Sequence, residues 1–196
     1  MNFDQWRYYL RGFLCEKLKR PECAIEAYHH AMRSNPDFGQ AAKCLGYLYA
    51  TRQEYGEAEN YFLQALRFKP KDAEAWFNLG FVRDKAGHKP QAVEAMCEAV
   101  RLKPRFDRAW YGLSLAQASL GQHAEAAQAL EKAAALQPMN GQVWYSLGMA
   151  YHHSRQPDKV TEVAHHLFRF DPVMTRRLIQ EAERADLAHW VQDMKV

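Results

Sequence analysis

Residues 73–106 read AEAWFNLGFVRDKAGHKPQAVEAMCEAVRLKPRF, and the same arrangement recurs along the chain. Apolar residues three and four positions apart lie on both sides of the break at Ala86-Gly87-His88. That spacing places side chains on one face of a helix, whereas glycine marks a turn. Pro90 falls in the first turn of a second helix, where its missing N–H is harmless. The stretch therefore predicts two helices joined by a short turn.

Five late prolines set the period. Pro36, Pro70, Pro104, Pro138 and Pro172 follow one another at intervals of 34 residues. Counting back from each proline defines five frames, 5–38, 39–72, 73–106, 107–140 and 141–174. Small or apolar residues hold the same places in successive frames, among them Leu at position 7 (Leu45, Leu79, Leu113, Leu147) and Ala at position 20 (Ala24, Ala58, Ala92, Ala126). A period of this length indicates a helical repeat array.

This pattern resembles the tetratricopeptide repeat (TPR) family, in which a large residue, Leu-Gly, two alanines and a late proline recur. The resemblance covers residues 5–174. It implies an all-α fold, a right-handed superhelix (α-solenoid) of five helix-turn-helix repeats, with residues 175–196 as a C-terminal capping helix. A lone helix pair cannot bury its apolar face, so we expect the array to form one folding unit.

The fifth frame departs from the others. Val160 and Leu167 are large where the other frames have alanine, and Ala164 is small where the first two have Tyr28 and Phe62. Volume is redistributed within the pair, which predicts a different packing at the end of the array. The segment that follows is amphipathic, as a terminal element of a repeat array must be.

Composition narrows the class of protein. Of 196 residues, 48% are hydrophobic and 25% charged, with a net charge of +3 that is spread along the chain. A disordered chain is thereby excluded, and clustered cations for nucleic acid are lacking. No signal peptide pattern or apolar run of membrane-spanning length is present, so we expect a soluble, cytoplasmic protein without membrane insertion. Four cysteines without a C-x-x-C pair are expected to be reduced, small, buried residues.

The resemblance also implies where a partner binds, because the first helices of TPR pairs line a groove with frame positions 2, 5, 6, 9, 12 and 13. Position 9 is usually polar in the family but is apolar here in every frame, which predicts a binding stripe unless local twist buries it. Position 5 is mostly aromatic, a choice that is equally compatible with a structural role. The two rows are Phe13, Tyr47, Phe81, Leu115, Met149 at position 9 and Tyr9, Lys43, Phe77, Tyr111, Tyr145 at position 5.

Part of a carboxylate clamp is also present. Some TPR domains hold the acidic tail of a chaperone with basic and amide side chains at set positions. Lys43, Asn78 and Arg108 match three of the five places, whereas Tyr47 and Gly112 do not. The missing charge-assisted bonds argue against an intact clamp. A looser contact of Lys43 and Arg108 with a carboxylate is the weaker alternative.

No catalytic motif accompanies the repeats. The chain has no P-loop, H-E-x-x-H or G-x-S-x-G sequence, and adjacent histidines such as His152 and His153 point about 100 degrees apart on a helix, which suits no shared metal. We therefore expect no enzyme activity, cofactor or metal. Three functions remain open: an adaptor for a protein or peptide, a homo-oligomeric scaffold joined through the apolar stripe Phe3, Trp6, Leu10 and Phe13, and a non-catalytic subunit of an enzyme complex.

Overall fold

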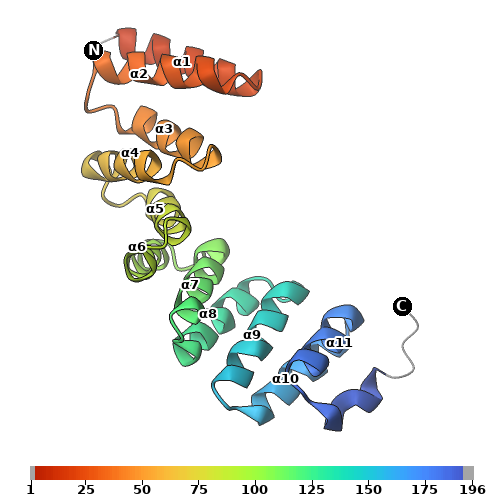
Figure 1. The fold of residues 1–196 in the computed structure, drawn as a ribbon. Helices are drawn as coiled ribbons and strands as arrows, with labels where there is room; N and C mark the ends of the chain where they lie inside the picture. The colour runs from red at the N-terminus through yellow and green to blue at the C-terminus, as the bar shows by residue number, and fades with distance from the viewer. Residues whose placement is uncertain (1–2, 192–196) are drawn as a thin grey trace. The chain divides into compact units, whose positions relative to one another are not determined.

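A computed structural model describes residues 3–191 of the chain as an all-α fold, with no strand among them. The described residues form two compact units, 3–104 and 105–191, where the sequence predicts one continuous array. The first unit holds three helix pairs, α1 (Phe3–Lys17) with α2 (Pro21–Ser34), α3 (Gly39–Thr51) with α4 (Tyr55–Phe68), and α5 (Ala73–Lys85) with α6 (Lys89–Leu102) (Figure 1).

The second unit holds two pairs and a closing segment. Its pairs are α7 (Asp107–Ser119) with α8 (His123–Leu136) and α9 (Gly141–His153) with α10 (Pro157–Phe168). The closing segment is α11 (Pro172–Glu181) followed by a short 3-10 helix, η1 (Ala185–Trp190), rather than one continuous helix (Figure 1). Residues 192–196 of the expected cap lie outside the described residues. First helices begin at residues 39, 73, 107 and 141, at the starts of four sequence frames; the frame boundaries as domain limits stay a prediction.

Every first helix ends in the same way. The residue three places past the last helical residue donates its N–H to the carbonyl five residues before it, for example from Arg20 to Cys15 and from Gln156 to Tyr151. The residue immediately before this donor has a positive φ in each turn, and these residues are Lys19, Gln53, Gly87, Gly121 and Arg155. This is the Schellman closure of a helix C-terminus, which lets the second helix of the pair fold back on the first. Only two of the five turns use glycine for the left-handed residue.

Close packing within a pair depends on one small residue. A Cβ on Gly46 of α3 would lie 2.9 Å from the ring of Phe62, which is buried on α4. The fifth pair differs, as its sequence predicts. Ala164 is small at the place of Phe62, and Leu178 of α11 instead lies against Gly148. The closing helix thus supplies the side chain that the second helix lacks.

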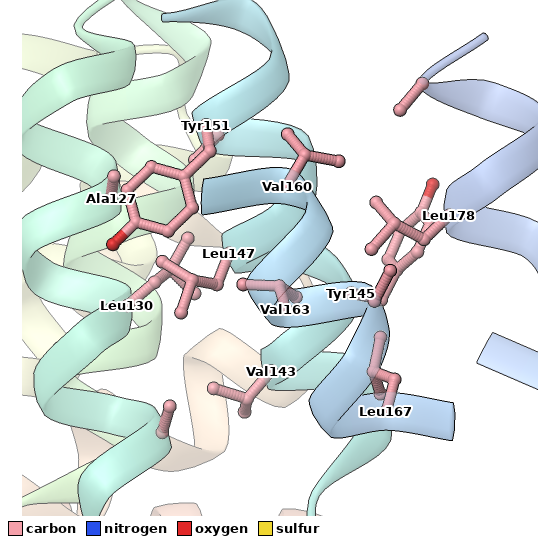
Figure 2. Close-up of a cluster of buried hydrophobic side chains, with 14 of the residues drawn as sticks. Ala127, Leu130, Val143, Tyr145, Leu147, Tyr151, Val160, Val163, Leu167 and Leu178 are labelled. Carbon is pink, nitrogen blue, oxygen red and sulfur yellow. The ribbon is translucent and has the colours of Figure 1, made fainter. Parts of the chain in front are cut away.

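The second unit has a continuous core around that closing helix. Buried residues from α8, α9, α10 and α11 contact one another there, including Leu130, Val143, Leu147, Leu167 and Leu178 (Figure 2). Val160 and Leu167, the two enlarged residues of the fifth frame, are both buried. The amphipathic pattern after Pro172 therefore packs against α9 and α10 with its apolar side.

The cysteine expectation was wrong in part. Cys15 of α1 and Cys23 of α2 are joined by a disulfide, with Cα atoms 5.8 Å apart. Cys97 is exposed and Cys44 is half-buried. Sequence spacing alone hides the pair, because the two cysteines meet only when the α1–α2 turn closes.

Candidate functional site

Four of the five side chains in the apolar row at frame position 9 are exposed to solvent. Exposed fractions are 48% for Phe13, 56% for Tyr47, 42% for Phe81 and 49% for Leu115. Local twist therefore does not bury these four side chains. Met149 differs, because it is half-buried against the core of the second unit. Large exposed side chains that recur on one face of successive first helices are typical of an interaction surface.

A cavity lies beside this row in the first unit. It has a volume of about 350 Å³ and is formed by residues of α3, α4 and α5. Four residues that the sequence predicts for the groove line it, namely Tyr47, Phe77, Asn78 and Phe81. The remaining lining residues are Ala50, Thr51, Phe62 and Val82. Apolar walls with few polar groups favour an apolar group of a ligand.

Two lysines at frame position 13 flank the row. The Lys85 ammonium lies 5.6 Å from the ring centre of Phe81, and the Lys17 ammonium lies 5.2 Å from that of Phe13. Both distances suit a cation–π contact. These lysines are not among the residues that the sequence predicts for the groove, although their separation of two periods and their place one turn after an aromatic are signals of a shared role.

Lys43 is already paired within the chain. Its ammonium donates to the carboxylates of Asp72 at 3.0 Å and Glu74 at 3.3 Å. Burial alone would lower the pKa of Lys43, but these bonds outweigh it and raise the pKa. Arg108, the other cation of the predicted carboxylate contact, belongs to the second unit and lies 5.6 Å from the Phe106 ring centre. The structure thus joins Lys43 with acidic residues of its own chain.

Aromatic residues at position 5 divide into different environments. Tyr9 is half-buried with its ring against Tyr28 and Phe38, and burial raises its pKa. Phe77 lines the cavity, and the Tyr111 hydroxyl lies 3.5 Å from that of Ser146.

Tyr145 is only 8% exposed and donates its hydroxyl hydrogen to Glu181 of α11. The closing helix also brings the Arg177 guanidinium to 4.5 Å from the centre of the Tyr145 ring. Burial, followed by the bond to Glu181, raises the pKa of the Tyr145 hydroxyl. The side chain therefore belongs to the core that Figure 2 shows.

Other site chemistry is sparse. Within residues 3–191, no group of three or more His, Cys, Asp or Glu side chains is arranged to hold a metal ion. His123 and His153 do approach, with ring centres 4.8 Å apart. Over the same range no helix has both the length and the apolar character needed to cross a membrane.

Paired helices with a recurring exposed apolar row define a helical-repeat protein of the interaction class. Family models confirm the kind of repeat. Tetratricopeptide repeat models match residues 7–38, 82–138 and 116–159, and a TPR repeat model matches residues 46–87. The chain belongs to the tetratricopeptide repeat family. Membership indicates a protein-interaction or scaffold role, and proteins of this family are typically non-catalytic.

Solved structures agree on the fold. "Crystal structure of MamA protein" is 22% identical with a TM-score of 0.79, covering 95% of this chain and 98% of that one. "Crystal structure of YrrB: a TPR protein with an unusual peptide-binding site" is 21% identical, with a TM-score of 0.79 and 90% of each chain covered. MamA 41-end from Desulfovibrio magneticus RS-1 is 21% identical at a TM-score of 0.76, covering 97% and 98%. No curated protein matches the chain.

Proposed function

We propose that this protein is an adaptor that holds a segment of a partner protein against the first helices of its repeats. The exposed position-9 row, with a cavity beside Tyr47 and Phe81, is the observation that carries the proposal. A row of this kind offers apolar anchoring sites at regular intervals, and buried apolar and aromatic anchors dominate the energy of interfaces. A partner that is itself an enzyme would make the chain a non-catalytic subunit through the same surface.

The test uses peptides selected on the full chain from a library of randomised dodecapeptides. The double variant Tyr47→Ser, Phe81→Ser should lose most of their binding, since each central anchor contributes roughly 2 kcal/mol or more. Its melting temperature should change little, because exposed positions affect the free energy of unfolding by about 0.5 kcal/mol each.

A matched control removes apolar side chains elsewhere. Leu120 and Met139 are 38% and 69% exposed but lie in the turns between helices and not on a first helix. The double variant Leu120→Ser, Met139→Ser should bind the peptides as tightly as the unmodified chain. A Tyr47→Ser, Phe81→Ser variant that folds and still binds, or a library that yields no binder, would contradict the adaptor proposal.

Self-assembly is the second candidate, supported by the exposed face of α1. Phe3, Trp6 and Leu10 are 81%, 47% and 60% exposed, and Phe13 continues the stripe. A second copy could cover this face. Light scattering of the full chain, with Trp6→Ser, Leu10→Ser as the comparison, separates the two functions. A monomer at every concentration tested would remove self-assembly, whereas an oligomer that the double variant abolishes would support it.

A further inference from the structure

We propose that the cavity between α3 and α5 accepts a large apolar side chain of an acidic peptide segment, whose neighbouring carboxylate binds Lys85. This inference rests on the proposed adaptor function and specifies the ligand's chemistry. The cavity defines the apolar part of the ligand. Its walls include the rings of Tyr47, Phe77 and Phe81, and its volume of about 350 Å³ is at the lower end for ligand sites, roughly 300–1,000 Å³. An amino-acid side chain suits that space better than a large cofactor does.

The polar groups of the cavity are few. Asn78 and Thr51 are the polar members among its eight lining residues, apart from the hydroxyl of Tyr47. The same wall includes Phe62 and Val82, which are 1% and 0% exposed. An apolar side chain that moves from water into this cavity would contact aromatic carbon. Removing its apolar surface from water is favourable through the hydrophobic effect. A charged side chain in the same place would lose hydration without an opposite charge among the lining residues.

Charge around the cavity defines the acidic part of the ligand. Four acidic residues on or next to the first helices of this unit are already bound within the chain. Asp84 accepts from the Lys89 ammonium at 2.7 Å. Asp72 and Glu74 share Lys43, and Glu16 accepts the hydroxyl hydrogen of Tyr28. These contacts satisfy the carboxylates locally, so they offer little attraction to a basic ligand.

The cations at position 13 are placed differently. Among residues 3–191, neither Lys17 nor Lys85 takes part in an ion pair, and each ammonium lies over an aromatic ring of the row. A lysine ammonium has three donors, and contact with a ring face leaves donors for a carboxylate. Lys85 lies over Phe81, which lines the cavity, so one peptide can reach both the cavity and the ammonium.

The positions of these lysines change which cation is expected to bind the carboxylate of the ligand. The sequence pointed to Lys43, but a ligand carboxylate there would have to displace both Asp72 and Glu74. Binding at Lys85 requires no such exchange. Complementary charge governs which partner is accepted more than how tightly it binds. The apolar cavity and Lys85 together therefore select a segment in which Leu, Met or an aromatic residue has Asp or Glu close to it in sequence.

The experiment compares peptides selected by three full-length proteins at neutral pH and low salt. They are the unmodified chain, Lys85→Glu, and Lys71→Glu as a control with the same change in net charge on an exposed loop residue. The probe is the library of randomised dodecapeptides. The unmodified chain and Lys71→Glu should enrich peptides with a large apolar residue near Asp or Glu. Lys85→Glu should lose the acidic preference or select Lys and Arg instead.

A single enriched peptide then gives the strength of the contact. Its dissociation constant should rise about threefold to tenfold on Lys85→Glu, in line with an exposed charge contact, and should rise with added salt. A peptide with Gln in place of its acidic residue should bind both proteins with similar affinity. Thermal melting checks that both variants fold.

The outcomes separate this inference from the adaptor function on which it rests. Peptides that need Tyr47 and Phe81 but show no acidic preference, or an acidic preference that Lys85→Glu leaves unchanged, would overturn the ligand assignment while the adaptor function stands. A library that yields no binder to the folded chain would overturn both.

Discussion

The Lys43 ammonium on α3 lies 3.0 Å from the carboxylate of Asp72, which caps the N-terminus of α5. Asp72 also accepts hydrogen bonds from the backbone N–H groups of Glu74 and Ala75. One carboxylate therefore ties the second helix pair to the start of the third. The helix cap and the ion pair together stabilise the folded state more than either interaction alone, because the cap fixes the carboxylate in position for the lysine.

The first prediction concerns the pH dependence of that contact. Burial alone would raise the pKa of Asp72, but hydrogen bonds from Lys43 and Ala75 outweigh it and lower the pKa. A lowered folded-state pKa stabilises the protein above the unfolded pKa, about 3.9, and this stabilisation is lost as pH falls through the folded value. Asp72→Asn keeps the cap but removes the charge, so it should cost about 0.5–1 kcal/mol at pH 7.

Urea unfolding of the two proteins over a pH series measures this. The difference in the free energy of unfolding should shrink towards zero once Asp72 is protonated. Asp72→Ala removes cap and charge together and should cost about 1–2 kcal/mol or somewhat more at pH 7. A difference between the unmodified chain and Asp72→Asn that is the same at every pH would show that the ion pair does not contribute.

A second prediction compares two glycines. Gly46→Ala would place a Cβ 2.9 Å from the buried ring of Phe62 and should cost about 1–3 kcal/mol, because a packed core resists added volume. Gly56→Ala meets no atom within 4 Å and lies in the first turn of α4, so it should be neutral or stabilising by up to about 1 kcal/mol. Thermal melts of the two single variants suffice. Equal melting temperatures would refute the close approach of α3 and α4.

The third prediction separates two tyrosines that the sequence placed in the same groove. Tyr145→Ala should cost about 3 kcal/mol, because it opens the core under α11 and leaves Glu181 without its hydroxyl partner. Tyr47→Ala should change the free energy of unfolding by at most about 1 kcal/mol, since its side chain is 56% exposed. Urea midpoints measure both. A Tyr145→Ala protein as stable as the unmodified chain would show that Tyr145 belongs to the groove and not to the core.

Helix positions and the exposed row were accessible from the sequence because they depend on local periodicity. Leu at position 7 is buried in α3, α5, α7 and α9, as its recurrence every 34 residues predicts. Tyr47 and Phe81 fall outside that packing pattern, and they are exposed. Even the altered packing of the fifth pair could be foreseen, because Ala164 leaves a volume that another element has to fill.

The turn backbone was less accessible. Lys19, Gln53 and Arg155 adopt the same left-handed conformation that Gly87 and Gly121 adopt in the other two turns. Glycine stands at this position in only two of the five turns, so the sequence shows no consistent period there. The Schellman closure imposes the conformation through its hydrogen bonds, and the packed helix pair sustains the strain that a side chain adds.

Residues of one type at one repeat position acquired different roles only in the folded chain. Tyr111 and Tyr145 occupy the same frame position, but Tyr145 is buried because α11 brings Leu178 and Glu181, both more than thirty residues later in the chain, to its repeat. Lys43 is neutralised by Asp72 and Glu74 across the boundary between two pairs, whereas Lys85 remains over Phe81. Periodicity assigns a side chain to a face of its own helix. Which distant side chain reaches that face is decided by the packing of helices against one another.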